Sequence, residues 1–268
     1  MTLRLHLAGW PAADLAARLE SVDAVVCTAG LACDAAGVER CRALLSPSEQ
    51  ERLASYSNAI VARRFARGRA LVREVVGSVL GLPAAQVPLR EGIHGKPCLA
   101  AGTVRRVWFS VSHTDDLLVV ALSRVADVGV DVERARALDQ WQRVADRVLD
   151  AQERRQLAIA VEQGSDPSEA LLRLWCRVEA ELKAVGCGIQ GLEQHLAGQR
   201  PRGLRFADLA ALPLPEELRA SGVYYHAAVA LVTPGAGYGL PAESRRHTVR
   251  ESAHDASPVA SPARASTA

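Results

Sequence analysis

The stretch VWFSVSHTDDLLVVALSRVADVGVDVERA, residues 107–135, contains three alternating or wholly apolar runs. The polar segments SHTDD and SRVAD separate these runs, and short polar breaks between strand-like runs are typical of turns. We therefore predict three antiparallel strands joined by short turns near the middle of the 268-residue chain.

Helical patterns lie on both sides of these strands. On the amino side, Ser46, Pro47 and Glu49 form the S-x-x-E capping box and first-turn proline that begin a helix. This helical region is expected to break near residues 55–58 and to end at Gly81. On the carboxyl side, helices are expected over residues 138–163 and 168–184.

The remaining strand-like runs complete a pattern in which helix followed by sheet occurs twice. The runs are LRLHLAGW, DAVVCTA, VPLREGIHGKPCLA, GLRFADLAAL and GVYYHAAVALVTP. We predict an α+β fold of two similar halves, each a small, mostly antiparallel sheet packed with helices. The predicted boundaries are 1–126 and 127–239, followed by a disordered tail over 240–268 that is rich in Ser, Ala, Pro and Arg.

Composition excludes several classes of function. A net charge of +2 provides no strong field toward nucleic acid or a membrane surface, and 4% aromatic residues argue against a stacking platform for single strands. No run approaches the roughly 20 apolar residues of a membrane span, and the amino terminus lacks a secretory pattern. The six cysteines show no C-x-x-C pair, which favours reduced thiols in a cytoplasmic protein over disulfides or zinc.

Lysine is almost absent from this chain. Of its 32 basic residues only Lys96 and Lys183 are lysines, so the other 30 are arginines. Trp175, Glu179 and Lys183 are spaced to lie on one side of a helix, and Glu181 is expected to face solvent. An ordinary Glu–Lys pair explains the spacing, but arginine would serve that pair equally well. A compact ammonium beside a phosphate would require lysine.

The segment GVDVE contains a second candidate for chemistry. Asp131 and Glu133 alternate with valines, so both carboxylates point to one face of a strand. Such a pair suits Mg²⁺ completed by waters and phosphate oxygens. The alternative is a solvated strand end with Glu133 paired to Arg134 or Arg136.

The other polar candidates carry weaker signals. His113 follows Ser112 at a turn, Lys96 lies in the turn HGKP, and five arginines crowd one helical region. Each is compatible with ordinary polar surface, although arginines also grip phosphate groups. The sequence contains no dinucleotide fingerprint, Walker lysine, nucleophile elbow or H-E-x-x-H motif.

Taken in order, these motifs resemble one family. GKP (95–97), FSVSHT (109–114), GVDVE (129–133) and W-C-R-V-E-A-x-x-K-A-x-G-x-G (175–188) are similar to the signature series of Sfp-type 4′-phosphopantetheinyl transferases, and the resemblance covers residues 46–234. It implies a monomer that holds coenzyme A and Mg²⁺, with Mn²⁺ as an alternative ion, between two similar halves. It also implies transfer of the phosphopantetheine arm to a serine of an apo acyl or peptidyl carrier protein, releasing 3′,5′-ADP. The carrier class, whether of fatty-acid, polyketide or nonribosomal-peptide synthesis, stays open.

The resemblance also implies roles for individual residues. Asp131, Glu133 and Glu179 match the metal ligands, and Glu179 is placed to orient or deprotonate the incoming serine. Lys183 matches the lysine at the pyrophosphate, so the implied catalytic residues are Asp131, Glu179 and Lys183. The implied coenzyme A contacts are Arg52, Arg64, Lys96, Ser112, His113 and Lys183, with Arg52, Arg64 and His113 at the 3′-phosphate.

One position departs from the family pattern W-x-x-K-E. Val178 stands where the family has a lysine, and Arg177 is a candidate to replace that charge from an adjacent direction. Two alternatives to a transferase therefore stay open. One is a non-catalytic relative that binds coenzyme A or a carrier; the other is a structural module whose acidic motifs are surface pairs.

Overall fold

The computed structural model describes residues 2–92, 96–100, 102–103 and 107–238. The predicted tail over 240–268 lies outside the described residues. Within the described ranges no helix is long and apolar enough to cross a membrane.

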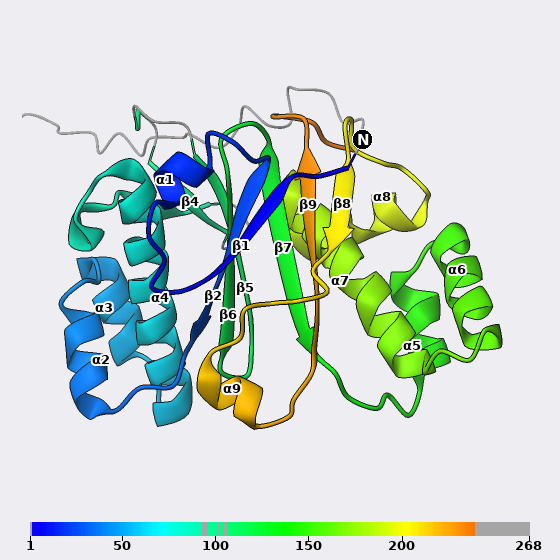
Figure 1. Cartoon of the computed structure of the whole chain (residues 1–268), viewed down its shortest axis with the longest axis horizontal. Helices are drawn as coiled ribbons and strands as arrows, with labels where there is room; N and C mark the ends of the chain where they lie inside the picture. The colour runs from blue at the N-terminus through cyan, green and yellow to red at the C-terminus, as the bar shows by residue number, and fades with distance from the viewer. Residues whose placement is uncertain (1, 93–95, 101, 104–106, 239–268) are drawn as a thin grey trace, which may run out of the picture.

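Two small sheets occupy the middle of the molecule (Figure 1). The first has the order β1-β2-β6-β5 and the second the order β7-β9-β8, and within them only β1 and β2 pair in parallel. Their bounds are β1 (Leu5–Gly9), β2 (Ala24–Gly30), β5 (Trp108–Thr114), β6 (Leu117–Ser123), β7 (Asp127–Arg134), β8 (Arg205–Asp208) and β9 (Tyr225–Val232); a short hairpin pairs β3 (Leu89–Glu91) with β4 (Pro97–Leu99). The α+β prediction, with small and mostly antiparallel sheets packed with helices, is confirmed. The boundary between halves at residue 126 stays a prediction.

Helices flank the sheets on two sides (Figure 1). The amino-terminal helices are α1 (Leu15–Arg18), α2 (Ala35–Arg42), α3 (Pro47–Ala54) and α4 (Ala59–Leu80). The later helices are α5 (Trp141–Val148), α6 (Ala151–Glu162), α7 (Pro167–Val185), α8 (Leu192–Leu196) and α9 (Glu216–Ala220). The sequence patterns missed α2, α8 and α9, and predicted α5 and α6 as one block.

Local capping determines the helix boundaries that sequence predicted best. The Ser46 side chain accepts from the Glu49 backbone N–H and the Glu49 carboxylate accepts from that of Ser46, which confirms the capping box of α3. Asn58 caps the start of α4, and Gly81 ends it with a φ of 72°. These bonds satisfy backbone groups that a helix end otherwise leaves without partners.

The prediction for residues 107–135 is partly wrong. Strands β5 and β6 form the expected hairpin, but β7 leaves that sheet and pairs with β9. Side chains join β5 to β7 instead: the Ser110 hydroxyl accepts from the Val130 N–H at 3.1 Å, and the Ser112 hydroxyl accepts from the Val132 N–H at 3.4 Å. The two sheets therefore meet at β5 and β7 through serine hydroxyls.

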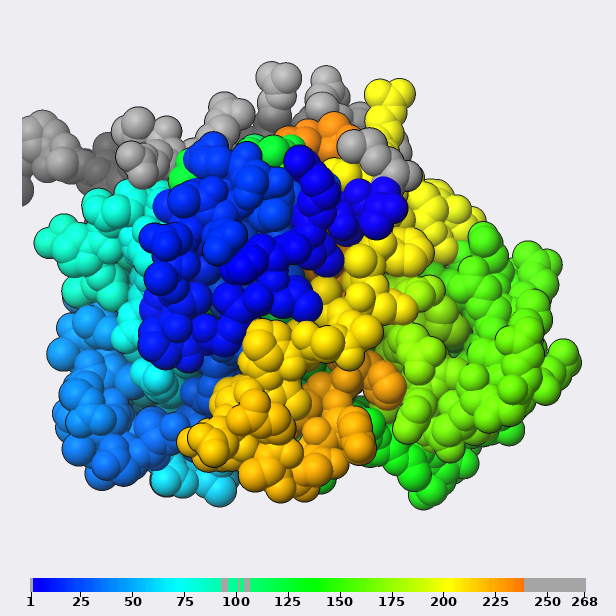
Figure 2. Space-filling view, in the orientation of Figure 1, coloured from blue at the N-terminus to red at the C-terminus, as the bar shows by residue number. Residues whose placement is uncertain are grey.

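One hydrophobic cluster is shared by both sheets. It combines first-sheet residues with second-sheet residues and with Leu209: Ala24, Val26, Leu117, Val119, Ala121, Val128, Val130, Val132, Ala227, Val229 and Leu231. The segment that precedes α9 contacts the first sheet at β2, where Thr28 donates to the Pro213 carbonyl. Figure 2 shows this segment, in gold, beside the blue amino-terminal residues on one face. Apolar burial consequently holds the two sheets together.

Helix α7 approaches the second sheet very closely. Cys176, Ala180 and Ala184 form a stripe of small residues that packs on β9. At Gly129 of β7 a Cβ atom would lie 1.9 Å from the Ala180 carbonyl oxygen and 2.4 Å from the Ala184 nitrogen. Glycine at position 129 is thus required for this helix–sheet distance.

We predict that Gly129→Ala lowers the free energy of unfolding by about 3 kcal/mol or more, because backbone atoms of α7 must move. Urea unfolding followed by circular dichroism measures the change. The matched control is Gly68→Ala in α4, where a Cβ would lie 3.5 Å from its nearest neighbour. That control should change stability by no more than about 1 kcal/mol. Equal effects of the two substitutions would contradict the close-packing argument.

Candidate active site

Three polar side chains from three elements meet where β5, β7 and α7 come together. Asp131 on β7 accepts from the Ser112 hydroxyl of β5 at 2.8 Å and from the Lys183 ammonium of α7 at 2.6 Å, both through Oδ1. Lys183 Nζ also lies 3.1 Å from the Ser112 hydroxyl. Asp131 is only 5% exposed, so its charge depends on these partners.

The other two predicted carboxylates flank this group. Glu179 Oε2 lies 3.9 Å from Lys183 Nζ, so the expected i,i+4 pair is present but longer than the bond to Asp131. Burial raises the pKa of Glu179, Lys183 opposes that shift, and Asp131 and Glu133 add to it. Glu133 pairs with Arg136 at 2.8 Å, which is the surface alternative considered for that residue.

The donor set around Asp131 fits a hard divalent cation. Asp131 Oδ2 is buried and has no hydrogen-bond partner among the described residues. The charges of Asp131 and Glu133 both act on Glu179, and all three residues offer the oxygen donors that Mg²⁺ prefers. The carboxylate oxygens of Asp131, Glu133 and Glu179 do not all lie within 4.8 Å of one another. Among the described residues, the group that meets this limit is Asp150, Glu153 and His195.

A cavity of about 610 Å³ adjoins this group on the amino-terminal side. Its lining includes Arg52, Arg64 and His113, the three residues that sequence assigned to one phosphate, together with Phe65 and Arg69. Partial desolvation and the positive charges of Lys183 and Arg64 lower the pKa of His113. His113 is therefore close enough to Lys183 of the site and to Arg64 of the cavity for both positive charges to act on it.

The cavity arginines are paired with carboxylates of the protein. Arg52 contacts Glu91 and stacks over the Phe65 ring at 5.4 Å. Arg64 Nε donates to Asp116 at 2.8 Å. The side chains of these ion pairs are partly exposed to solvent, so each pair contributes little stability. An incoming polyanion can therefore displace the carboxylates from the guanidinium groups with little loss of free energy.

Lys96 does not line this cavity, although its neighbour Pro97 does. Its ammonium donates to the Val128 carbonyl of β7 at 3.3 Å and to the Lys183 carbonyl of α7. The Lys96 ammonium is therefore directed at the backbone of β7 and of α7.

The departure at Val178 has a structural explanation. Val178 is 1% exposed and belongs to the cluster that packs α7 against α5 and α6. Arg177 does not replace the missing charge at the site, because it forms a bidentate pair with Asp208 of β8 at 2.7 and 2.6 Å. It also stacks over Phe206 at 5.0 Å.

Comparisons with known proteins match both parts of this arrangement. Residues 127–211 match the family model of the 4′-phosphopantetheinyl transferase superfamily, and residues 35–125 match that of the 4′-phosphopantetheinyl transferase amino-terminal region. Two consecutive segments are thus similar to 4′-phosphopantetheinyl transferases.

Individual relatives bear the same description. The 4′-phosphopantetheinyl transferase HetI of Nostoc is 30% identical over 133 residues, which are 49% of this chain and 55% of HetI. AcpT of Salmonella typhi is 36% identical over 115 residues, 42% of this chain and 57% of AcpT. The transferase psf-1 of Bacillus pumilus is 31% identical over 131 residues, 48% of this chain and 53% of psf-1. The chain therefore spans little more than half the length of these relatives.

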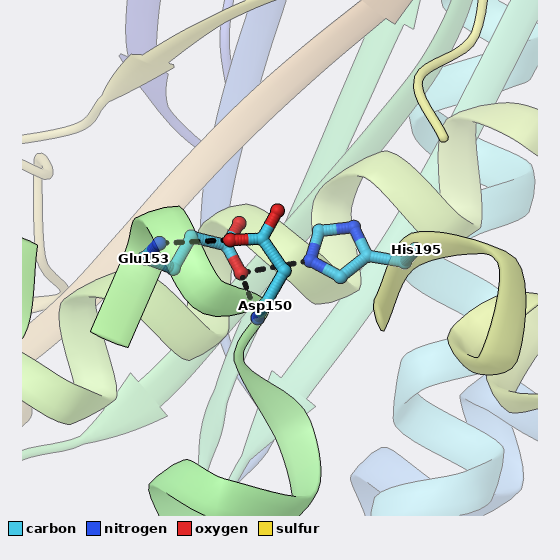
Figure 3. Close-up of side chains that lie close together, drawn as sticks. All are labelled: Asp150, Glu153 and His195. Carbon is cyan, nitrogen blue, oxygen red and sulfur yellow. Dashed lines mark hydrogen bonds and ion pairs between the residues drawn. The ribbon is translucent and has the colours of Figure 1, made fainter. Parts of the chain in front are cut away.

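A second polar cluster, which the sequence patterns did not predict, includes Glu181 of α7, and Figure 3 shows its members Asp150, Glu153 and His195. Glu181, expected at the surface, is 4% exposed and accepts from the Tyr238 hydroxyl at 2.7 Å. His195 is fully buried and bridges Glu181, at 3.2 Å, and Glu153, at 2.9 Å. The prediction for Glu181 is wrong because residues distant in sequence cover that face of the helix.

This cluster already contains its own cations. Asp150, Glu153 and His195 are close enough to form a metal site. However, Arg200 contacts Asp150 and lies 3.5 Å from Glu153 Oε1 and 3.8 Å from Glu181 Oε2. The Asp150 carboxylate also accepts from the Gln152 and Glu153 N–H groups as the cap of α6. Arg200 and His195 neutralise the carboxylates, so the geometry favours a structural network.

The network predicts a specific pH dependence of stability. Burial opposes protonation of His195, but hydrogen bonds to Glu153 and Glu181 outweigh it and raise its pKa from 6.5 to about 9. Because the folded-state pKa lies above the ordinary value, the stabilisation is complete below about pH 6.5 and is lost as the pH rises through about 9. The loss should amount to about 3 kcal/mol.

Urea unfolding between pH 6 and pH 10 measures this slope. His195→Gln should be less stable at pH 6 and should lack most of the slope, whereas His6→Gln, remote from the cluster, should retain it. A wild-type free energy of unfolding that stays flat across this range would contradict an imidazolium at position 195.

Proposed function

We propose that this chain transfers the 4′-phosphopantetheine arm of coenzyme A to a serine of an apo carrier protein, as an Sfp-type, Mg²⁺-dependent holo-[carrier protein] synthase. The observation that supports this most directly is the junction at β5. Ser112 binds Asp131 in the carboxylate group, and the next residue, His113, lines the arginine-rich cavity. Coenzyme A carries a diphosphate and a separate phosphate on its nucleotide. The diphosphate matches the site that contains Lys183 and would hold a cation, and the nucleotide phosphate matches the adjoining cavity with its arginines.

The cavity supplies recognition of the nucleotide end. Arg52, Arg64 and His113 would bind the 3′-phosphate, since guanidinium groups form bidentate bonds to phosphate. Binding exchanges the contacts of Arg52 with Glu91 and of Arg64 with Asp116 for contacts with a dianion. The Phe65 ring at the cavity wall adds an apolar surface.

The carboxylate group supplies the chemistry. The carrier serine oxygen forms a bond to the phosphorus that bears the pantetheine arm, the bridging P–O bond to the nucleotide breaks, and 3′,5′-ADP leaves with the electron pair. Glu179 accepts the serine proton directly or through a water, and its raised pKa makes it a stronger base than an exposed carboxylate. Lys183 offers a compact positive charge to the diphosphate.

Asp131, Glu133 and Glu179 are the residues that would hold the divalent ion. When bound, the ion would supply neutralisation of the charge that develops on the diphosphate. Among the described residues, Asp131 Oδ2 is a buried carboxylate oxygen without a hydrogen-bond partner, and it is free to bind such an ion.

The first test is mass spectrometry of carrier proteins after incubation with the purified chain, coenzyme A and Mg²⁺. We expect the mass of one phosphopantetheine to be added per carrier, with none on a carrier whose acceptor serine is replaced by alanine. A panel drawn from fatty-acid, polyketide and nonribosomal-peptide carriers tests the breadth implied by the Sfp-type resemblance. Coenzyme A binding without transfer to any carrier would overturn the transferase and favour a binding relative.

We predict that Asp131→Asn lowers kcat/KM by at least about a hundredfold, because it removes a charged ligand oxygen. Calorimetry should show a parallel loss of Mn²⁺ or Mg²⁺ affinity. The matched control is Asp139→Asn at an exposed position, which should change neither quantity. Unchanged metal binding in Asp131→Asn would remove Asp131 from the proposed ligand set.

A further inference from the structure

The two lysines of this chain contact each other. Lys96 donates its ammonium to the backbone carbonyl of Lys183, across 87 positions of sequence, and also to the Val128 carbonyl at 3.3 Å. The Lys183 side chain in turn holds Asp131 and Ser112. Lys183 is therefore restrained at two places. Lys96 binds its backbone carbonyl, and Asp131 and Ser112 bind its ammonium.

The carbonyl that Lys96 binds is one that the helix itself leaves open. Helix α7 ends at Val185, and the N–H of Gly186 returns to the Leu182 carbonyl. The carbonyls that follow Leu182 belong to the last turn, which has no intrahelical donors and carries the negative end of the helix dipole. A cation at this place fixes the last turn of α7 relative to β7.

The surroundings of Lys96 show why arginine would not serve. Burial lowers the pKa of Lys96, while Asp127 and Cys98 oppose that shift, Lys183 adds to it and Cys187 opposes it. A compact ammonium can donate to two carbonyls at this half-buried position. The five N–H donors of a planar guanidinium would leave several unsatisfied.

The β3–β4 hairpin connects this contact to the cavity. Glu91 of β3 contacts Arg52 and lies 3.6 Å from Arg69 Nη2, and both arginines line the cavity. Pro97 of β4 also lines it and directly follows Lys96. The same short element thus touches the cavity wall and the end of the catalytic helix.

We propose that Lys96 is a positioning residue, which clamps the backbone of Lys183 so that the Lys183 ammonium stays directed at Asp131 and the diphosphate. This inference rests on the proposed transferase function, and it replaces the nucleotide contact that sequence assigned to Lys96. Loss of the clamp should release the last turn of α7 and misplace the ammonium without removing any contact to the nucleotide.

The experiment uses selective labelling, because the chain has only two lysines. Lysine labelled with ¹³C and ¹⁵N gives two side-chain amine signals in NMR. In Lys96→Met the signal that remains is that of Lys183. We expect that signal to shift in Lys96→Met. In the transfer assay we expect kcat to fall by about tenfold or more, with KM for coenzyme A within about twofold of the wild type.

Two further variants make the result specific. Arg90→Met removes an exposed cation from the same hairpin and should leave the Lys183 signal and kcat unchanged. Lys96→Arg keeps the charge but not the compact ammonium, and should shift the signal as well. Circular dichroism melting establishes that each variant is folded before it is compared.

The outcomes separate the clamp from the transferase. A Lys183 signal that does not move in Lys96→Met, or a KM for coenzyme A that rises while kcat stays constant, would overturn the positioning role. The same holds if Arg90→Met moves the signal equally, or if Lys96→Arg leaves both signal and kcat as in the wild type. If the wild type transfers nothing, the proposed function fails, and the NMR comparison still decides the clamp.

Discussion

The bond between Lys183 and Asp131 is the constraint around which the rest of the site is arranged. A carboxylate that is 5% exposed requires a cation, and the nearest one stands on a helix from a different layer of the fold. Buried ion pairs contribute little net stability, since desolvation offsets most of the Coulomb attraction. The pair therefore contributes more to fixing the positions of these charges than to the stability of the fold.

Close packing makes this pair possible. The stripe Cys176, Ala180 and Ala184 has no long side chain to hold α7 away from the sheet, and Gly129 lets the backbones approach. A wider separation would move the Lys183 ammonium out of reach of Asp131. The glycine of GVDVE thus acts through geometry, and the two acidic residues of the same motif are the metal ligands that we propose.

Some of this was open to prediction from sequence because it depends on neighbours in the chain. The capping box at Ser46, the break at Asn58 and the stop at Gly81 are local, and alternation alone places Asp131 and Glu133 on one side of β7. Features formed by distant residues were missed. The pairing of β7 with β9 in place of β6 depends on a strand about one hundred residues later.

The burial of Glu181 is the clearest case of such a miss. In the sequence alone, a glutamate two positions from both Glu179 and Lys183 is indistinguishable from a surface residue. Only the fold brings His195 and Tyr238 to it. The direction of the Lys96 side chain could not be predicted either. Its partner is the backbone carbonyl of Lys183, and every residue type has such a carbonyl.

These two missed features explain why α7 can serve as a rigid support. One face carries Glu179 and Lys183 at the site, while Glu181 points away into the network of His195, Tyr238 and Arg200. The carboxyl end is held by Lys96. A site built from side chains on an element restrained on its far face and at its end keeps its geometry when the ligand arrives. The buried network and the contact of Lys96 therefore restrain the helix that carries two of the proposed site residues, Glu179 and Lys183.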